Sequence, residues 1–220
     1  MDKSEITFDS LMNDVKEFVR ELDLAIALMG LSKPFYEDER IWERFDNTYE
    51  GHAFSLCQYS VDYSLVLSVC RCHDGRDDSH GLSIFFQHLK EDLIRDKLKE
   101  GIYARRVLHV KKDEAAQDTR DHMKQIDRAR ELHTSLKSSH QFRLVKDFRH
   151  KHIAHRGKNK AESTEKEHLY YLVEKTQEIV NLLTAPILGS TEDFKGSIDI
   201  CKMYAERLCN ILMTGSASKS

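Results

Sequence analysis

"DEAAQDTRDHMKQIDRARELHTSLKSSHQFRLVKDFRHKHIAHR" (residues 113–156) is the stretch of the chain that decides the fold class. It contains no proline and no glycine, and its many charged residues surround a sparse apolar stripe. The stripe has helical spacing and consists of Met123, Ile126, Ala129, Leu136, Phe142, Val145 and Phe148. The stretch therefore predicts one long amphipathic helix, or two helices that break near "SLKSSH" (135–140). Gly157 closes it in either case.

The rest of the chain also has the spacing of helices. We expect further helices at about residues 9–30, 51–72, 83–101, 165–187 and 194–213. Gly30 is expected to end the first of them and Ser83 to cap the third, whereas residues 102–112 are expected to form a loop or a short irregular piece. The fold predicted is all-α, a helical bundle in which a long charged helix carries a basic motif near its C-terminal end. One domain is expected over residues 1–213, followed by a disordered tail at 214–220.

Bulk composition excludes several classes of protein. The net charge of −3 over 220 residues means that a site for a polyanion has to be a local patch. Five cysteines without a regular framework favour reduced thiols in a cytoplasm over a secreted disulfide scaffold. No window approaches 18 uninterrupted apolar residues, and the N-terminus lacks the apolar core of a signal peptide. We therefore expect a cytoplasmic protein with no membrane segment.

The strongest local patch of positive charge is "DFRHKHIAHRG" (147–157). On a helix, Arg149, His152 and Arg156 lie close to one line along the axis, and His155 flanks that line. Cations in the last turn of a helix interact favourably with its dipole, so a basic helix end that contributes only to stability is one interpretation.

Catalytic chemistry is the other interpretation. The guanidinium group of arginine binds phosphate oxygens with two parallel hydrogen bonds, and histidine transfers protons near neutral pH. An arginine and a histidine side by side are sufficient for RNA cleavage without a metal: the 2′-hydroxyl attacks phosphorus, histidine assists the proton transfer, and arginine stabilises the developing charge.

The same residues resemble a known family. In "RHKHIAH", Arg149 is followed by five residues and then His155, which is similar to the R-x4-6-H motif of the HEPN superfamily. The sequence "FRHKHIAHR" looks most like the AbiU-like abortive-infection branch, because it lies late in a charged helix that is followed by two more helices. The resemblance implies a metal-independent endoribonuclease that acts as a homodimer without a cofactor. It makes Arg149 and His155 the catalytic pair and His150 the polar residue that follows the arginine. We add His152 and Arg156 as candidates for binding substrate phosphate.

Such a protein would be a toxin or antiphage effector acting on RNA, with an antitoxin or another regulator as a further partner. Some HEPN toxins carry a tyrosine two residues after the motif histidine, which an antitoxin modifies, but this chain has Gly157 there. The alternative is a non-catalytic all-α module that binds RNA or protein. A third hypothesis, a metal-dependent hydrolase, predicts loss of activity with a chelator, and the absence of a convincing set of carboxylate ligands beside the histidines counts against it.

Other polar clusters have weaker signals. "CRCHD" (70–74) invites a zinc hypothesis, but its spacing matches no usual zinc site; Cys70 is expected buried and Cys72 half-exposed. "HDGRDDSHG" (73–81) lacks the ligand spacing of a calcium loop. The single histidines at positions 88, 122, 133 and 140 are expected on the surface. The basic residues of 102–112 form either an RNA-guiding patch or a connector.

Overall fold

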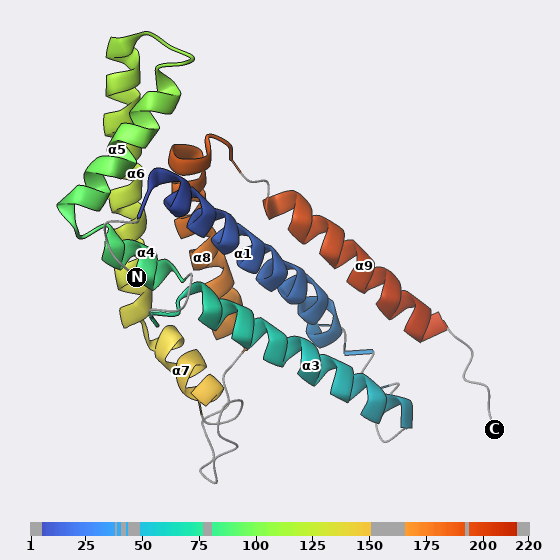
Figure 1. The fold of residues 1–220 in the computed structure, drawn as a ribbon. Helices are drawn as coiled ribbons and strands as arrows, with labels where there is room; N and C mark the ends of the chain where they lie inside the picture. The colour runs from blue at the N-terminus through green and yellow to red at the C-terminus, as the bar shows by residue number, and fades with distance from the viewer. Residues whose placement is uncertain are drawn as a thin grey trace. The chain divides into compact units, whose positions relative to one another are not determined.

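The computed structural model describes residues 6–37, 39–40, 43, 49–76, 81–150, 166–191 and 194–214. Within these ranges the chain forms eight helices and no strand, so the all-α prediction is confirmed (Figure 1). The helices are α1 (Phe8–Glu37), α3 (Tyr49–Cys72), α4 (Leu82–His88), α5 (Asp92–Arg106), α6 (Lys112–Ser138), α7 (His140–Phe148), α8 (Lys166–Leu188) and α9 (Phe194–Thr214).

The chain divides into two compact units. The first unit comprises residues 1–22 and 69–192, and the second comprises residues 23–68 and 193–220. Because this division does not test whether the chain is one domain, the single domain over residues 1–213 stays a prediction. The candidate site lies entirely within the first unit.

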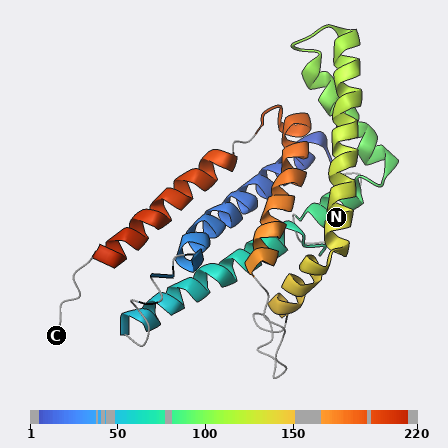
Figure 2. The ribbon, with the colours of Figure 1, turned by 180° about the vertical axis from the view of Figure 1, so that it is seen from behind.

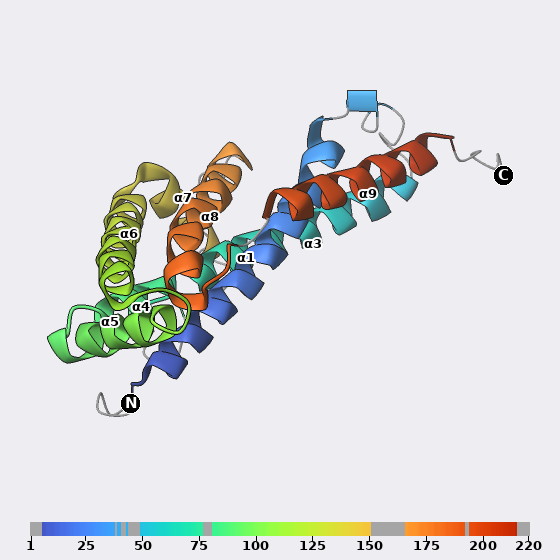
Figure 3. The same ribbon diagram turned by 90° about the horizontal axis from the view of Figure 1, so that it is seen from above.

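The first unit is built on the pair α6 and α8, which stand side by side (Figures 1 and 3). Helices α4 and α5 also pack against α6, and α7 follows the end of α6 and packs against α8 (Figure 2). Buried residues recur every three or four positions along both central helices. On α6 they are Ala115, Thr119, Met123, Ile126, Ala129, His133 and Leu136. Each fully buried Val, Leu, Ile, Phe or Met side chain stabilises the fold by about 1.5–3 kcal/mol.

The long charged stretch forms two helices, so of the two sequence-based alternatives the break near "SLKSSH" holds. Ser139 has extended backbone angles (φ −68°, ψ 154°), and its side chain accepts a hydrogen bond from the Phe142 amide at 3.1 Å. A serine in this role ends one helix and caps the next. After Phe148 the backbone widens into a π-helical turn at Arg149 and His150. Such turns are rare within α-helices and frequently occur at functional sites.

The prediction that Gly30 ends the first helix is wrong. Helix α1 continues through Gly30 and Pro34 to Glu37. A Cβ atom at Gly30 would lie 2.7 Å from the Cβ of Cys201, so the glycine allows α1 and α9 to approach each other within the second unit. That unit also contains an edge-to-face ring pair, Phe35 and Phe54, whose centroids are 5.1 Å apart.

The predicted helix at 83–101 is two helices, because the chain turns between His88 and Asp92. Ser83 does not cap α4, since Gly81 is its N-cap residue; its hydroxyl instead donates to the carbonyl oxygen of His73 at 2.7 Å.

The predicted irregular piece at 102–112 is partly helical, because α5 extends to Arg106. Arg105 donates to the carbonyl oxygens of Pro186 and Ile187 at the end of α8, and Arg106 forms an ion pair with Asp118. These two arginines are therefore engaged within the fold, which favours the connector interpretation of this stretch.

The substitution Gly30→Ala tests the close contact between α1 and α9. Alanine favours a helix by about 1 kcal/mol over glycine, yet the new methyl group would clash with the Cys201 Cβ. We expect a net loss of about 1–3 kcal/mol in the free energy of unfolding, measured by urea denaturation. In a Cys201→Gly background the same substitution should be neutral or stabilising, and an equal loss in both backgrounds would contradict the contact.

Candidate functional site: a basic cleft around Arg149

A cleft of about 430 Å³ opens where the end of α3, the end of α6 and the length of α7 meet. Its walls come from the α3 end and the loop after it, from the last turn of α6, and from one side of α7 continued into the π-helical turn. The lining residues are Cys70, His73, Asp74, Gly75, Arg76, Lys137, Phe142, Lys146, Arg149 and His150.

Positive charge dominates this cleft. Arg76 pairs with Asp74 at 2.9 Å, which also holds the pKa of that carboxyl group below its usual range. Among the residues that the structure describes, no carboxylate lies within ion-pair distance of Lys137, Lys146 or Arg149. Burial and the nearby charge of Lys146 lower the pKa of Lys137. An anion bound between these cations would relieve their mutual repulsion.

His73 lies at the base of the cleft and is 3% exposed. Its ring stacks on that of His133 at 5.4 Å and 15°, and meets the Phe142 ring edge-to-face at 5.4 Å. Burial, followed by the neighbouring His133 and Lys137, lowers the pKa of His73 well below its ordinary value. His73 is therefore neutral at physiological pH.

The hydrogen bonds of His73 fix its tautomer. The Thr176 hydroxyl donates to the Leu172 carbonyl oxygen at 2.7 Å, so it accepts from Nε2 of His73 at 2.8 Å. The ring proton is therefore on Nε2, and Nδ1 keeps a lone pair that has no partner in the described part of the chain.

His133 is buried, so the prediction that it lies on the surface is wrong. It is 5% exposed, and its ring lies 5.1 Å from that of Phe86. Burial, with a smaller effect of Lys137, lowers the pKa of His133 to about 4. Its register with Ala129 and Leu136 on the buried side of α6 is the sequence signal that indicates this position.

The thiols beside the cleft are unreactive. Cys70 and Cys72 are both free and buried, so the half-exposed position expected for Cys72 is wrong. Burial raises the pKa of the Cys70 thiol to about 11, even though Arg149 lies close enough to oppose that shift. A protonated thiol is a poor nucleophile and a poor metal ligand. Within the described ranges, no three His, Cys, Asp or Glu side chains converge as a metal site requires.

The structure describes two of the five site residues predicted from the sequence. Arg149 is half-buried, His150 is exposed, and both line the cleft. His152, His155 and Arg156 lie outside the described residues, so their roles stay predictions. Sequence reasoning missed Lys137 and Lys146, because nothing in their spacing separates them from the other lysines of a charged helix.

Comparison with known proteins gives the family. A model of the HEPN AbiU2 family, described as AbiU2, matches residues 8–207, which is most of the chain. The chain belongs to the HEPN AbiU2 family. No curated protein and no solved structure matches it. The AbiU2 match covers most of both units and the whole basic stretch at 147–157. Across the described ranges, no helix combines the length and apolar character needed to cross a membrane.

The buried histidine pair predicts a pH-dependent stability. The folded-state pKa of His133 is about 4, below the 6.5 of an exposed histidine. The unfolded chain therefore takes up this proton first as the pH falls, and His133 stabilises the fold above pH 6.5 but not below about 4. Between pH 6.5 and about 4, His133 alone is expected to lower the free energy of unfolding by on the order of 3 kcal/mol. His73 shifts in the same direction.

Urea denaturation between pH 7 and 4.5 measures this loss. The substitution His133→Gln should make the free energy of unfolding less steeply dependent on pH. His140→Gln, at an exposed position on α7, is the matched control and should keep the wild-type slope. Identical slopes for the wild type and His133→Gln would rule out a buried neutral His133.

Proposed function

We propose that this chain is a metal-independent endoribonuclease that cleaves RNA through attack of the 2′-hydroxyl on the adjacent phosphorus. The observation that carries the proposal is the position of Arg149 in a cleft. Within the described ranges, the cations of this cleft that have no ion-pair partner outnumber its carboxylates. Membership of the HEPN AbiU2 family supports it, because the R-x5-H stretch from Arg149 to His155 falls within the matched residues.

Two groups of the chain act in this reaction. His155 takes the proton of the 2′-hydroxyl, the 2′-oxygen bonds to phosphorus, and the P–O5′ bond breaks as the 5′-oxygen takes a proton from water. The hydroxide that remains takes the proton back from His155, which restores the free imidazole. The products are a 2′,3′-cyclic phosphate and a 5′-hydroxyl end. Arg149 binds the phosphoryl oxygens as their negative charge grows.

The lysines of the cleft support this role of Arg149. Lys137 and Lys146 lie on two different helices, and both line the same hollow as Arg149. Their charges attract the RNA backbone before the reaction and stabilise the phosphorane-like transition state during it. His150 lines the cleft too, and with His152 and Arg156 it completes the proposed substrate-binding set.

The biological part of the proposal is a toxin or antiphage abortive-infection effector in the cytoplasm. RNA is its substrate, a second copy of the chain is its partner in a homodimer, and an antitoxin or another regulator controls it. A single cleft contacts a strand from one side, whereas two copies facing each other across a two-fold axis enclose a strand from both sides.

Cleavage of total RNA by the purified protein in EDTA tests the activity. Relative to the wild type, Arg149→Ala should lower the rate by about 10²–10³-fold and His155→Ala by about 10²–10⁴-fold. Arg143→Ala removes an exposed arginine of α7 that does not line the cleft, and it should cleave like the wild type. Equal cleavage by all four proteins would indicate a contaminant. No cleavage by a folded wild type would favour the alternative, a non-catalytic binding module.

Expression in a bacterial host tests the toxin proposal separately. Induction of the wild type should stop growth, because RNA damage halts translation, and Arg149→Ala should restore growth at the same protein level. Growth arrest by the wild type and the Arg149→Ala variant alike would show that toxicity does not depend on this cleft.

A further inference from the structure

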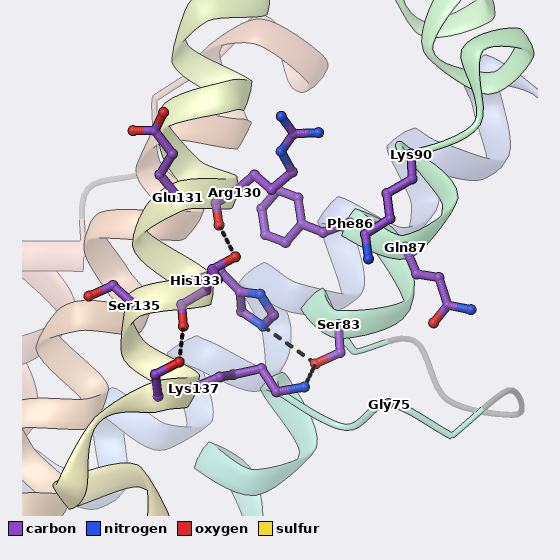
Figure 4. A pocket seen from close by; sticks show the side chains of 12 residues that line it. Gly75, Ser83, Phe86, Gln87, Lys90, Arg130, Glu131, His133, Ser135 and Lys137 are labelled. Carbon is purple, nitrogen blue, oxygen red and sulfur yellow. Dashed lines mark hydrogen bonds between the residues drawn. The ribbon is translucent and has the colours of Figure 1, made fainter.

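A second hollow adjoins the Arg149 cleft. It has a volume of about 940 Å³ and lies between α4 and α6 (Figure 4). Gly75 and Lys137 line both hollows, so the pocket begins where the cleft ends. The ammonium group of Lys137 is held at this junction, because it donates to the Ser83 hydroxyl at 3.0 Å.

Two further cations face this pocket from opposite walls. Lys90 extends from the connection between α4 and α5, and Arg130 extends from α6 (Figure 4). No carboxylate lies within ion-pair distance of Lys90 in the described ranges. Arg130 lies 3.5 Å from Asp127, but Arg95 already binds both oxygens of that carboxylate at 2.8 and 2.6 Å.

The carboxylate lining this pocket does not cancel their charge. Glu131 pairs with Arg128 at 3.2 Å, and Figure 4 shows its side chain pointing away from Lys90 and Arg130. The pocket therefore carries a net positive potential, continuous through Lys137 with that of the Arg149 cleft.

The floor of the pocket offers little to a nucleobase. Phe86 is 3% exposed and His133 is 5% exposed, so neither ring presents a face on which a base can stack. The polar groups that a ligand can reach are the ends of the cationic side chains, the amide of Gln87 and the hydroxyls of Thr134, Ser135 and Ser138. Cationic, amide and hydroxyl side chains of this kind contact phosphates without reading sequence.

We propose that this pocket is a phosphate-binding subsite for single-stranded RNA next to the cleavage position. A strand with its reacting phosphate at Arg149 passes Lys137 and places a neighbouring phosphate between Lys90 and Arg130. The pocket and the cleft share Gly75 and Lys137, so one backbone can run through both in succession. This inference rests on the proposed function, and it adds that substrate is selected by its single-stranded backbone rather than by base sequence.

Salt dependence of binding tests the subsite without requiring cleavage. The probe is a 2′-O-methylated dodecanucleotide RNA, which has no 2′-hydroxyl to attack phosphorus, with binding followed by fluorescence anisotropy. Each lost phosphate contact lowers the slope of log K against log salt by about 0.7 for a single strand. The double variant Lys90→Gln/Arg130→Gln removes both cations from the one phosphate held between them, so it should lose about 0.7 from the wild-type slope.

The matched control is Lys124→Gln/Lys175→Gln, which removes the same net charge from lysines paired with Asp121 and Glu178 outside the pocket. It should keep the wild-type slope, and thermal unfolding shows that both variants are folded. An unchanged slope for the Lys90/Arg130 variant, or an equal loss in both variants, overturns the subsite.

Cleavage of unmodified RNA by the wild type separates the two claims. Cleavage together with an unchanged slope removes the subsite and leaves the endoribonuclease. The expected change in slope without any cleavage supports the subsite as a place where a strand binds, and removes the endoribonuclease.

Discussion

The first unit depends on one buried, uncharged imidazole at the point where its helices meet. His73 follows the end of α3, bonds to Thr176 on α8, stacks on His133 of α6 and touches Phe142 of α7. Its carbonyl oxygen accepts from Ser83 on α4. A proton on this ring would be a buried charge beside Lys137, so the packing requires neutrality. Because the histidine at the base of the cleft is neutral, the positive charge of the cleft lies on Lys137, Lys146 and Arg149, where a phosphate can reach it.

Periodicity in the sequence predicts most of the helices but not their boundaries. The apolar stripes of α6, α8 and α9 identify these helices, and α3 is identified by an apolar run too long for a usual strand. The local propensity of glycine predicts that α1 ends at Gly30. The glycine instead lies in the middle of α1, where its lack of a side chain leaves room for Cys201. The turn between α4 and α5 has no proline or glycine to mark it, because it is set by how both helices pack on α6.

Only part of the candidate site can be predicted from the sequence. The basic stretch at 147–157 indicates Arg149 and His150, and both line the cleft. Lys146 lies three residues before Arg149 at the end of the same helix. Lys137 lies at the end of α6, and only the bend at Ser139 brings it to the same hollow as Arg149. In the sequence, His73 stands out only as part of "CRCHD", whose spacing matches no usual zinc site. Its structural role becomes evident only from its contacts with α4, α6, α7 and α8.

The most direct measurement uses a DNA strand that contains a single ribonucleotide, incubated with the protein in EDTA. Attack by a 2′-hydroxyl at the Arg149 cleft predicts one cut, immediately 3′ of the ribonucleotide, that leaves a 2′,3′-cyclic phosphate. Arg149→Lys should slow that cut, because a lysine cannot bind two phosphate oxygens with parallel hydrogen bonds. Cuts elsewhere in the strand, or in an all-DNA control, would contradict the mechanism.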